Sequence, residues 1–326
     1  RIVPEGGIPL EVGVVVNNVG TLFNVARAAE GIPVTQRYLT VTGEVKNPVT
    51  LRVPVGTSIA QVAEWAGGIA NGGGRSMRDE LAFVAGGAMM GHVVQATDVV
   101  TKTTGGLLVL PVDSVVVRWM TKPLANAIRR GMSTCDQCRD CTDLCPRNLL
   151  GHALVPHEIM RSINYGLEQP TRIVTASVLC CECRLCEAYA CPLELSPMAY
   201  YRAVKRKLAE ASWKNTVHRR RDLTPHEMFQ YRRVPMGRLI DKLGLTPYHD
   251  YPVPLSEQDW QPKEVRIPLK QHTGAPAAPT VKEGDKVKRG DLIACIPEDK
   301  LGANVHASMD GKVKEVTEKH IWIETG

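Results

Sequence analysis

The chain has 326 residues, enough for two or three domains, and 44 % of them are hydrophobic, which excludes a wholly disordered protein. Its longest apolar stretch, residues 106–120, is interrupted by Pro111, Asp113 and Arg118 and is too short to span a bilayer. No signal peptide opens the sequence, so we expect a cytoplasmic protein that is not membrane-spanning.

The positive charge is concentrated in one segment. The net charge is only +6, from 40 Lys and Arg against 34 Asp and Glu, yet residues 202–242 contain twelve basic and four acidic residues. Arg219, Arg220 and Arg221 form the densest part of this segment. Because no nucleic-acid motif accompanies it, we favour a solvated helix face, or steering of an acidic redox partner, over nucleic-acid binding.

The first 36 residues predict a connector and one helix. Residues 11–16 are expected to form a strand. A helix is expected next, because apolar residues recur at helical spacing: Leu22, Val25, Ala26 and Ala29.

Residues 37–120 predict a small α+β domain. Ser58 is placed to cap a helix that ends at Gly67. Strands are expected at residues 38–45, 49–53, 81–85 and 107–112. Two strands joined by a turn, then a helix and further strands, are typical of a β-grasp domain.

The rest of the chain changes character twice. Residues 121–245 are expected to be helical, with a capping box at Thr224-Pro225-His226-Glu227 opening one helix and Pro235 ending it. The Pro-rich residues 246–264 predict a linker. Residues 265–326 alternate short strands with Gly turns, which is typical of an all-β sandwich or barrel. The fold class is therefore α+β and multidomain.

Nine of the ten cysteines lie between Cys135 and Cys191. In a reducing compartment, such crowding indicates metal binding rather than disulfides. The first run has the spacing of bacterial ferredoxins: Cys135-x2-Cys138-x2-Cys141-x3-Cys145-Pro146. The second run is similar, with one more residue before its last cysteine: Cys180-x2-Cys183-x2-Cys186-x4-Cys191-Pro192.

The two runs together predict two 4Fe–4S clusters. Three thiolates of one run occupy three corners of a cluster, and the fourth, which precedes a proline, ligates the other cluster. The first cluster would take Cys135, Cys138, Cys141 and Cys191. The second would take Cys180, Cys183, Cys186 and Cys145. Zinc is the alternative, but it prefers two separated pairs of cysteines.

Several residues in this region fall outside the two ligand sets. Cys181 is expected to be a small buried apolar residue, and Cys295 a structural one. Arg139, Arg147 and Arg184 either offset the negative charge of the clusters or are solvated surface residues. The chain carries no recognisable hydrolytic or nucleophilic motif, so the residues themselves predict a one-electron relay.

The order of motifs resembles a known group of electron-transfer proteins. Residues 13–22, with the letters GVVVNNVGTL, resemble the segment that closes the FMN-binding domain in the flavoprotein subunit of respiratory complex I and in the C subunit of the Rnf complex. Residues 38–45 resemble the soluble-ligand-binding β-grasp domain that follows there, and the ferredoxin pair comes next. Residues 271–276 and 306–308 resemble the barrel-sandwich hybrid domain of the Rnf C subunit. With that domain C-terminal, the order is similar to the cobalamin reductases of propanediol-utilisation microcompartments.

This resemblance implies a domain division and a set of cofactors. The implied parts are residues 1–36 as the end of a flavin domain and a connecting helix, 37–120 as the β-grasp domain, 121–245 as the ferredoxin-like domain, 246–264 as a linker, and 265–326 as the barrel-sandwich hybrid. The family's flavin and NADH domain would precede residue 1, so FMN is expected to bind only together with that domain. Asn17, Asn18 and Thr21 correspond to residues near the flavin edge, and helix capping is the alternative role for them.

The implied activity is an oxidoreductase that passes electrons from NADH through FMN and two clusters to cobalamin in a bacterial microcompartment. The implied partners are redox proteins and shell or cobalamin-handling proteins. An Rnf-like C subunit is the alternative. A scaffold or carrier module is a further one, in which Lys300 would bear a lipoyl or biotinyl group in place of being an ordinary exposed lysine. His92 is a conceivable cobalt ligand or a simple loop histidine.

Overall fold

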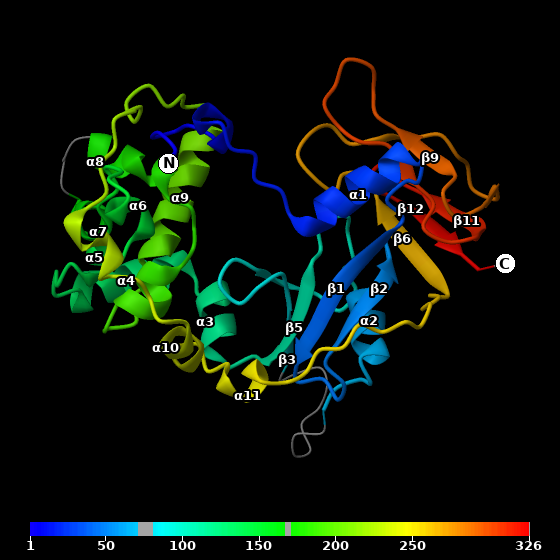
Figure 1. The fold of residues 1–326 in the computed structure, drawn as a ribbon, viewed down its shortest axis with the longest axis horizontal. Helices are drawn as coiled ribbons and strands as arrows, with labels where there is room; N and C mark the ends of the chain where they lie inside the picture. Colours follow the sequence, from blue (N-terminus) through cyan, green and yellow to red (C-terminus); the bar gives the residue numbers. More distant parts are fainter. Residues whose placement is uncertain (71–80, 167–170, 326) are drawn as a thin grey trace. The chain divides into compact units, whose positions relative to one another are not determined.

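A computed structural model describes residues 1–70, 81–166 and 171–325 of the chain (Figure 1). Contacts within it group the chain into two compact units. The first unit comprises Arg1–Val16 and Arg118–His249, and the second comprises Asn17–Val117 and Asp250–Gly326. Within the described residues, no helix is both long enough and apolar enough to cross a membrane.

The first unit is helical, as expected. Its longer helices are α4 (Leu124–Thr134), α7 (Pro156–Asn164), α9 (Pro197–Glu210) and α10 (Met236–Lys242). Its short turns are η1 (Pro9–Val12), α5 (Asp140–Asp143), α6 (Pro146–Leu149), α8 (Thr171–Thr175), η2 (Ala176–Leu179), η3 (Cys186–Ala190), η4 (Glu227–Gln230) and α11 (Thr246–His249). Helix α3 (Val115–Thr121) lies at the boundary of the two units.

Helices α4, α7 and α9 pack together around the core that carries the cysteines. A proline begins each of α7 and α9, where its missing N–H costs no helical hydrogen bond. Gly131 of α4 faces Tyr200 of α9 so closely that a Cβ at this position would collide with the tyrosine hydroxyl. The absence of a side chain therefore lets the two helices approach.

Two expectations for this unit are wrong. Residues 11–16 do not form a strand, because Pro9–Val12 is a 3-10 turn that ends at Gly13, with φ of 70°, and no described strand pairs with the exposed residues that follow. The capping box at residues 224–227 does not form either. His226 instead caps the short turn η4, with its side chain accepting from the Met228 N–H at 3.1 Å.

The second unit contains a five-stranded sheet with the order β2-β1-β5-β3-β4. Its strands are β1 (Gln36–Gly43), β2 (Val49–Pro54), β3 (Leu81–Ala85), β4 (His92–Val94) and β5 (Gly106–Pro111). Strands β1 and β5 are parallel, with Val41 opposite Leu107, and the other pairs are antiparallel. All four predicted strands are confirmed, while β4 was not predicted.

Helix α2 (Ile59–Trp65) packs its apolar residues against this sheet. Ser58 caps it as expected, since its hydroxyl accepts the Gln61 N–H at 3.3 Å. Helix α1 (Val19–Ala29), also in the second unit, confirms the helix predicted from apolar spacing, although no residue of it is buried.

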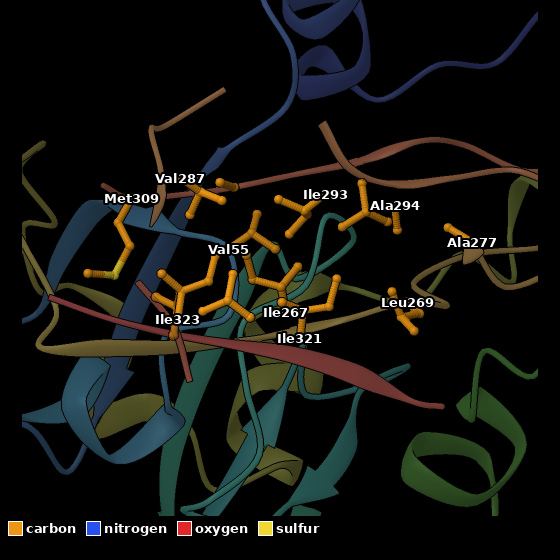
Figure 2. Close-up of a cluster of buried hydrophobic side chains, with 14 residues drawn as sticks. Val55, Ile267, Leu269, Ala277, Val287, Ile293, Ala294, Met309, Ile321 and Ile323 are labelled. Carbon is orange, nitrogen blue, oxygen red and sulfur yellow. The ribbon is translucent and has the colours of Figure 1, made fainter. Parts of the chain in front are cut away.

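The C-terminal part of the second unit is all-β, as expected. It contains β6 (Glu264–Pro268), β7 (Ala278–Pro279), β8 (Lys286–Val287), β9 (Leu292–Cys295), β10 (Val305–His306), β11 (Gly311–Val316) and β12 (His320–Glu324). These strands form two sheets, β10-β9-β7 and β6-β12-β11-β8. Figure 2 shows their shared core, in which Ile267, Ile293 and Ile321 surround Val55.

Val55 joins this C-terminal core to the five-stranded sheet. It follows strand β2 and is 2 % exposed, and its carbonyl accepts a hydrogen bond from the Ser308 hydroxyl at 2.6 Å. The segment expected to be a linker, residues 246–264, is mostly exposed but makes contacts with the sheet and its helix. Leu255 bridges to Thr50, and Trp260 stacks on Trp65 with the ring centroids 5.3 Å apart.

Candidate metal centre

The two cysteine loops have the same backbone conformation. In each loop, the residue two positions after the first cysteine and the residue one position after the second cysteine have positive φ. These residues are Gln137 and Arg139 in the first loop, and Glu182 and Arg184 in the second, with φ between 57° and 73°. A left-handed conformation costs free energy for residues other than glycine, so it persists only where the surroundings require it. Both loops therefore turn at the same two positions relative to their cysteines.

The unequal spacing of the two runs has a structural explanation. Three residues separate Cys141 from Cys145, and α5 makes a single α-helical turn over part of that interval. Four residues separate Cys186 from Cys191, and together with Cys186 they form η3, a π-helical turn that Cys191 ends. A π-helix closes its hydrogen bonds one residue later than an α-helix, so it absorbs the additional residue. Cys191 is therefore presented much as Cys145 is.

The first predicted set of thiols lies together. Burial raises the pKa of the Cys141 thiol to about 12, and three neighbouring thiols add to the shift: Cys191, Cys138 and Cys135. Electrostatic influence of this kind falls with distance, so these four sulfurs share one neighbourhood. They include Cys191, which belongs to the second run in the sequence.

The second predicted set also lies together. Burial and then the Glu187 carboxylate raise the pKa of the Cys186 thiol, and the thiols that add to the shift are Cys180, Cys145 and Cys141. Burial raises the pKa of the Cys180 thiol to about 12, again with Cys145 among its neighbours. The pKa of Cys183 is raised in turn by its contact with Cys181, by burial and by Cys186. Cys145 thus lies among the cysteines of the second run.

Several N–H groups point at the cysteine sulfurs. The Glu182 N–H donates to Cys180 Sγ at 3.3 Å, and the Leu195 N–H donates to Cys191 Sγ at the same distance. The Gln137 side chain donates to Cys135 Sγ at 3.2 Å. Donors of this kind stabilise thiolates and raise the reduction potential of a cluster that the thiolates hold.

A zinc ion and a 4Fe–4S cluster would place these thiols differently. Within the described residues, no three or more His, Cys, Asp or Glu side chains converge as they would on one metal ion. A zinc ion draws its cysteine sulfurs to about 2.3 Å from a single centre, whereas a 4Fe–4S cluster offers a separate iron to each thiolate. The predicted donor set is eight thiols, three to a loop with the fourth exchanged, which is the number and type of ligand that two clusters would need.

The three arginines of the loops have different roles. Arg184 is buried, with its side chain 3 % exposed, and pairs with Glu187 at 2.9 Å, so a solvated surface role is excluded for it. Arg147 is half-buried. Burial raises the pKa of the Cys145 thiol and Arg147 opposes this effect, whereas Arg147 adds to the lowering of the pKa of the Cys181 thiol. Arg139 is exposed, which agrees with the surface interpretation.

Cys181 is not the buried apolar residue that we expected. It is half-buried, and its thiol contacts Cys183 and Arg147. The contact with Cys183 lowers the pKa of Cys181 against the effect of burial, and Arg147 adds to the decrease. Its position beside Cys183, Cys145 and Cys180 places it at the edge of the second set.

Sequence reasoning missed two residues of this centre. Lys205 of α9 donates to the Cys180 carbonyl at 2.6 Å and to the Glu182 carboxylate at 2.9 Å, which braces the second loop. Tyr201, also in α9, is buried among cysteines of both sets. The sequence signal that remained unused is the helical spacing of these two residues, four apart on one face of α9.

Much of the basic segment at residues 202–242 is paired within the chain. Arg220 binds the buried Glu5 carboxylate at 2.6 Å, and Arg232 binds Asp143 at 3.0 Å. Arg202 and Arg206 are exposed and line a cavity of about 130 Å³ beside the second cysteine loop, together with Lys122. Their ion pairs, with Glu182 at 3.4 Å and Glu210 at 3.8 Å, are solvent-exposed ones of a kind that contributes little.

The proposed flavin contacts lie on helix α1. Asn18 caps it, accepting the Gly20 N–H at 2.8 Å, so the capping role is confirmed for that residue. Asn18 and Thr21 line a cavity of about 440 Å³ with Arg37 and Lys102. Both cations already donate to carbonyl groups, and Asn17, Asn18 and Thr21 are exposed. These residues by themselves do not fit the phosphate and ring of FMN.

Two further candidates lie in the second unit. His92 begins the edge strand β4 and is exposed, so its placement in a loop is wrong. Lys300 is exposed between the paired strands β9 and β10, where an ordinary surface lysine is also expected.

Comparison with known proteins matches all three parts of the chain. Family models match an SLBB domain at residues 38–93, a 4Fe-4S dicluster domain at 134–196 and the RnfC barrel sandwich hybrid domain at 254–325. The dicluster match spans all eight proposed ligands. The cobalamin reductase PduS of Citrobacter freundii is 43 % identical over the whole chain, which covers 70 % of that relative. The chain belongs to the PduS family of cobalamin reductases.

Other relatives agree with this assignment. The PduS protein of Salmonella typhimurium is 41 % identical over the whole chain, again with 70 % of the relative covered. The C subunit of the Na⁺-translocating ferredoxin:NAD⁺ oxidoreductase complex of Acetobacterium woodii is 35 % identical over 46 % of the chain and 30 % of its own length. The resemblance seen in the sequence is thus confirmed. As a member of the PduS family, the chain is an iron–sulfur oxidoreductase that transfers electrons.

Proposed function

We propose that this PduS-family chain relays electrons through two 4Fe–4S clusters to cobalamin. The observation that carries the proposal is the pair of cysteine loops with one shared backbone conformation, each grouped with the fourth thiol of the other run. Such clusters supply one-electron chemistry. The relatives named cobalamin reductase supply the acceptor class.

The first cluster is held by Cys135, Cys138, Cys141 and Cys191, and the second by Cys145, Cys180, Cys183 and Cys186. The exchange of the fourth ligand ties the two loops into one unit, so the centres lie within a single buried core. The chain's own contribution is to bury the thiols, to donate N–H groups to their sulfurs, and to brace the second loop through Lys205.

The proposed domain division is 1–36, 37–120, 121–245, 246–264 and 265–326. A β-grasp assignment for residues 37–120 is supported by the sheet order β2-β1-β5-β3-β4, by the parallel β1–β5 pair and by α2 packed on the sheet. In the family of this chain, the SLBB domain is a soluble-ligand-binding module, so this sheet is the part we assign to cobalamin or a cobalamin-handling partner.

Electrons are proposed to enter from NADH by way of FMN held by a segment or partner other than the described residues. The exposed Asn17, Asn18 and Thr21 on α1 would lie at the flavin edge only when such a segment completes the site. The proposed location is the cytoplasm, within a bacterial microcompartment, with shell proteins among the partners. Membership of the PduS family supports that location.

The proposed docking point for a redox partner is the cavity lined by Lys122, Arg202 and Arg206. These cations lie beside the second cysteine loop, so an acidic partner would dock near the second cluster. With an acidic bacterial ferredoxin as the donor, we expect electron transfer to slow with rising salt and with Arg206→Glu. Lys214→Glu, a charge reversal elsewhere in the basic segment, is the matched control and should have a smaller effect. Equal effects of the two variants would refute this docking point.

The central experiment is anaerobic reconstitution followed by cobalamin reduction. The full chain should bind about eight iron and eight sulfide per molecule, as two 4Fe–4S clusters require. After reduction and removal of the reductant, it should convert cob(III)alamin to cob(II)alamin, one electron per cobalt, followed by absorbance. A chain with Cys141→Ala and Cys180→Ala, which lacks a ligand of each cluster, is the control.

The outcomes separate the alternatives. Zinc in place of iron would overturn the cluster assignment. Two clusters that reduce an acidic ferredoxin but no corrinoid would instead support an Rnf-like C subunit, which the 35 % identical relative represents. A chain without redox-active absorbance, or with a mass increment on Lys300, would support a scaffold or carrier module.

A further inference from the structure

Two adjacent tyrosines in α9 differ in one respect. Tyr200 and Tyr201 are each 1 % exposed. The Tyr200 hydroxyl donates to Asn164 Oδ1 at 2.7 Å and also lies 3.3 Å from the Ala127 carbonyl. The Tyr201 hydroxyl is fully buried and has no hydrogen-bond partner among the described residues. A buried hydroxyl without a partner is costly, because it has given up its hydrogen bonds to water.

Tyr201 packs in the same buried core as Cys141, Cys145, Cys180 and Cys186, which include proposed ligands of both clusters. Burial raises its pKa well above the ordinary value, and four cysteines add to the shift: Cys186, Cys141, Cys145 and Cys180. Three of these four belong to the second set, and Cys186 has the largest influence. Cys141 belongs to the first set, so the side chain lies where the two sets approach each other.

Packing alone does not explain a tyrosine at this position. Phenylalanine would fill nearly the same space in the core without a hydroxyl to satisfy. Tyr200 shows how this fold satisfies a buried hydroxyl when the partner is protein, since Asn164 is placed to receive it. No comparable protein acceptor serves Tyr201 in the described part of the chain. The Tyr201 hydroxyl is therefore free to donate to a group other than the described protein residues.

We propose that the Tyr201 hydroxyl donates a hydrogen bond to a sulfur of the cluster held by Cys145, Cys180, Cys183 and Cys186. The inference rests on the proposed function, because it requires that cluster. Cluster sulfurs are hydrogen-bond acceptors, and donors to them stabilise the added negative charge of the reduced state. Tyr201 thus acts as a direct hydrogen-bond donor that raises the reduction potential of the second cluster relative to the first.

The test compares Tyr201→Phe with Tyr200→Phe in the full reconstituted chain. Iron and sulfide are measured first, and the two midpoint potentials then follow from a redox titration monitored by electron paramagnetic resonance. Tyr201→Phe should keep both clusters and lower the potential of the second. A tenfold loss in its reduction equilibrium corresponds to about 59 mV for one electron. Tyr200→Phe should leave the potential of the second cluster unchanged while lowering thermal stability, because the Tyr200 hydroxyl donates to Asn164.

A second variant tests the same hydrogen bond if Tyr201→Phe does not bind both clusters. Site-specific replacement of Tyr201 by 3-fluorotyrosine keeps the ring and strengthens the hydroxyl as a donor, so the potential of the second cluster should rise. Unchanged potentials in a chain with both clusters, or equal shifts from the Tyr200 and Tyr201 variants, would overturn the inference. A wild-type chain without two clusters would instead overturn the proposed function, and the iron analysis distinguishes the two results.

Discussion

Replacement of Cys145 by alanine should remove the second cluster and spare the first, although Cys145 belongs to the first cysteine run. The Cys145 thiol is buried, and its pKa is raised by burial and by Cys181. Cys145 in turn adds to the raised pKa values of Cys180 and Cys186 in the second run. The pKa of Cys141, four residues earlier, is raised by burial and by the thiols of Cys191, Cys138 and Cys135. One helical turn therefore separates two cysteines that we propose as ligands of different clusters.

The magnitude follows from the composition of the two sets. Each cluster has four protein thiolates, and the loss of one leaves three, so Cys145→Ala should retain about four of about eight iron atoms per chain. A three-iron form of the affected cluster would raise this value slightly. Because bound metal also stabilises the folded state, the variant should unfold at a lower temperature than the wild type.

The assay records the electron paramagnetic resonance spectrum of each reconstituted variant and groups the variants by the cluster signal that is lost. Cys145→Ala and Cys180→Ala should lose one signal in electron paramagnetic resonance, and Cys141→Ala and Cys191→Ala should lose the other. Cys181→Ala is the matched control, because it removes a half-buried thiol from the same loop outside both sets. It should retain all the iron.

A different grouping would refute the reasoning. If Cys145→Ala and Cys141→Ala lose the same signal, each run holds its own cluster and the exchange of fourth ligands does not occur. If Cys181→Ala loses iron, Cys181 replaces one of the assigned ligands in the second set.

Three further predictions concern folding. Burial raises the pKa of Glu5, but hydrogen bonds, above all from Arg220, outweigh this effect and hold the pKa below its ordinary value of 4.5. The ionised Glu5 carboxylate therefore stabilises the fold above pH 4.5, and this contribution disappears as the pH falls through the lowered pKa. Glu5→Gln should cost about 1–3 kcal/mol at pH 7, measured by anaerobic urea unfolding, and the difference from wild type should vanish in acid. Gly151→Ala should destabilise by about 1–3 kcal/mol, because Gly151 has a φ of 91° and an added Cβ would collide with the Thr224 carbonyl; an unchanged urea midpoint would contradict this. Ser58→Ala should cost about 1 kcal/mol by the same measurement through loss of a helix cap, with Ser58→Thr as the retaining control.

The chemistry of the centre could be predicted from the sequence because ligand spacing is a local property. Three cysteines at successive three-residue steps must share one tight loop, and a following proline directs the fourth away, whatever surrounds them. The helix cap at Ser58 and the four strands of the first sheet were predictable for the same reason, since caps, turns and alternation depend on near neighbours.

The features that were missed depend on partners distant in the sequence. Residues 11–16 have the composition of a strand but no strand to pair with, and Glu5 nearby is held by Arg220, more than two hundred residues away. His92 became part of a strand only because β3 offers an open edge to it. By its place in the sequence, Val55 is expected only to end a strand, yet its side chain packs in the core of the C-terminal module.

The sequence by itself predicted the eight cysteine ligands and their division into two loops, and it determined the order of the modules that the family models match, because each depends on spacing along the chain. Only the tertiary structure decided how the additional residue before Cys191 is absorbed, by a π-helical turn, and which arginine of the loops is buried. It also decided that two adjacent tyrosines of α9 have different surroundings, one with a protein acceptor and one among the thiols. Burial and hydrogen-bond partners arise from packing between distant segments, and no pattern within α9 distinguishes Tyr200 from Tyr201.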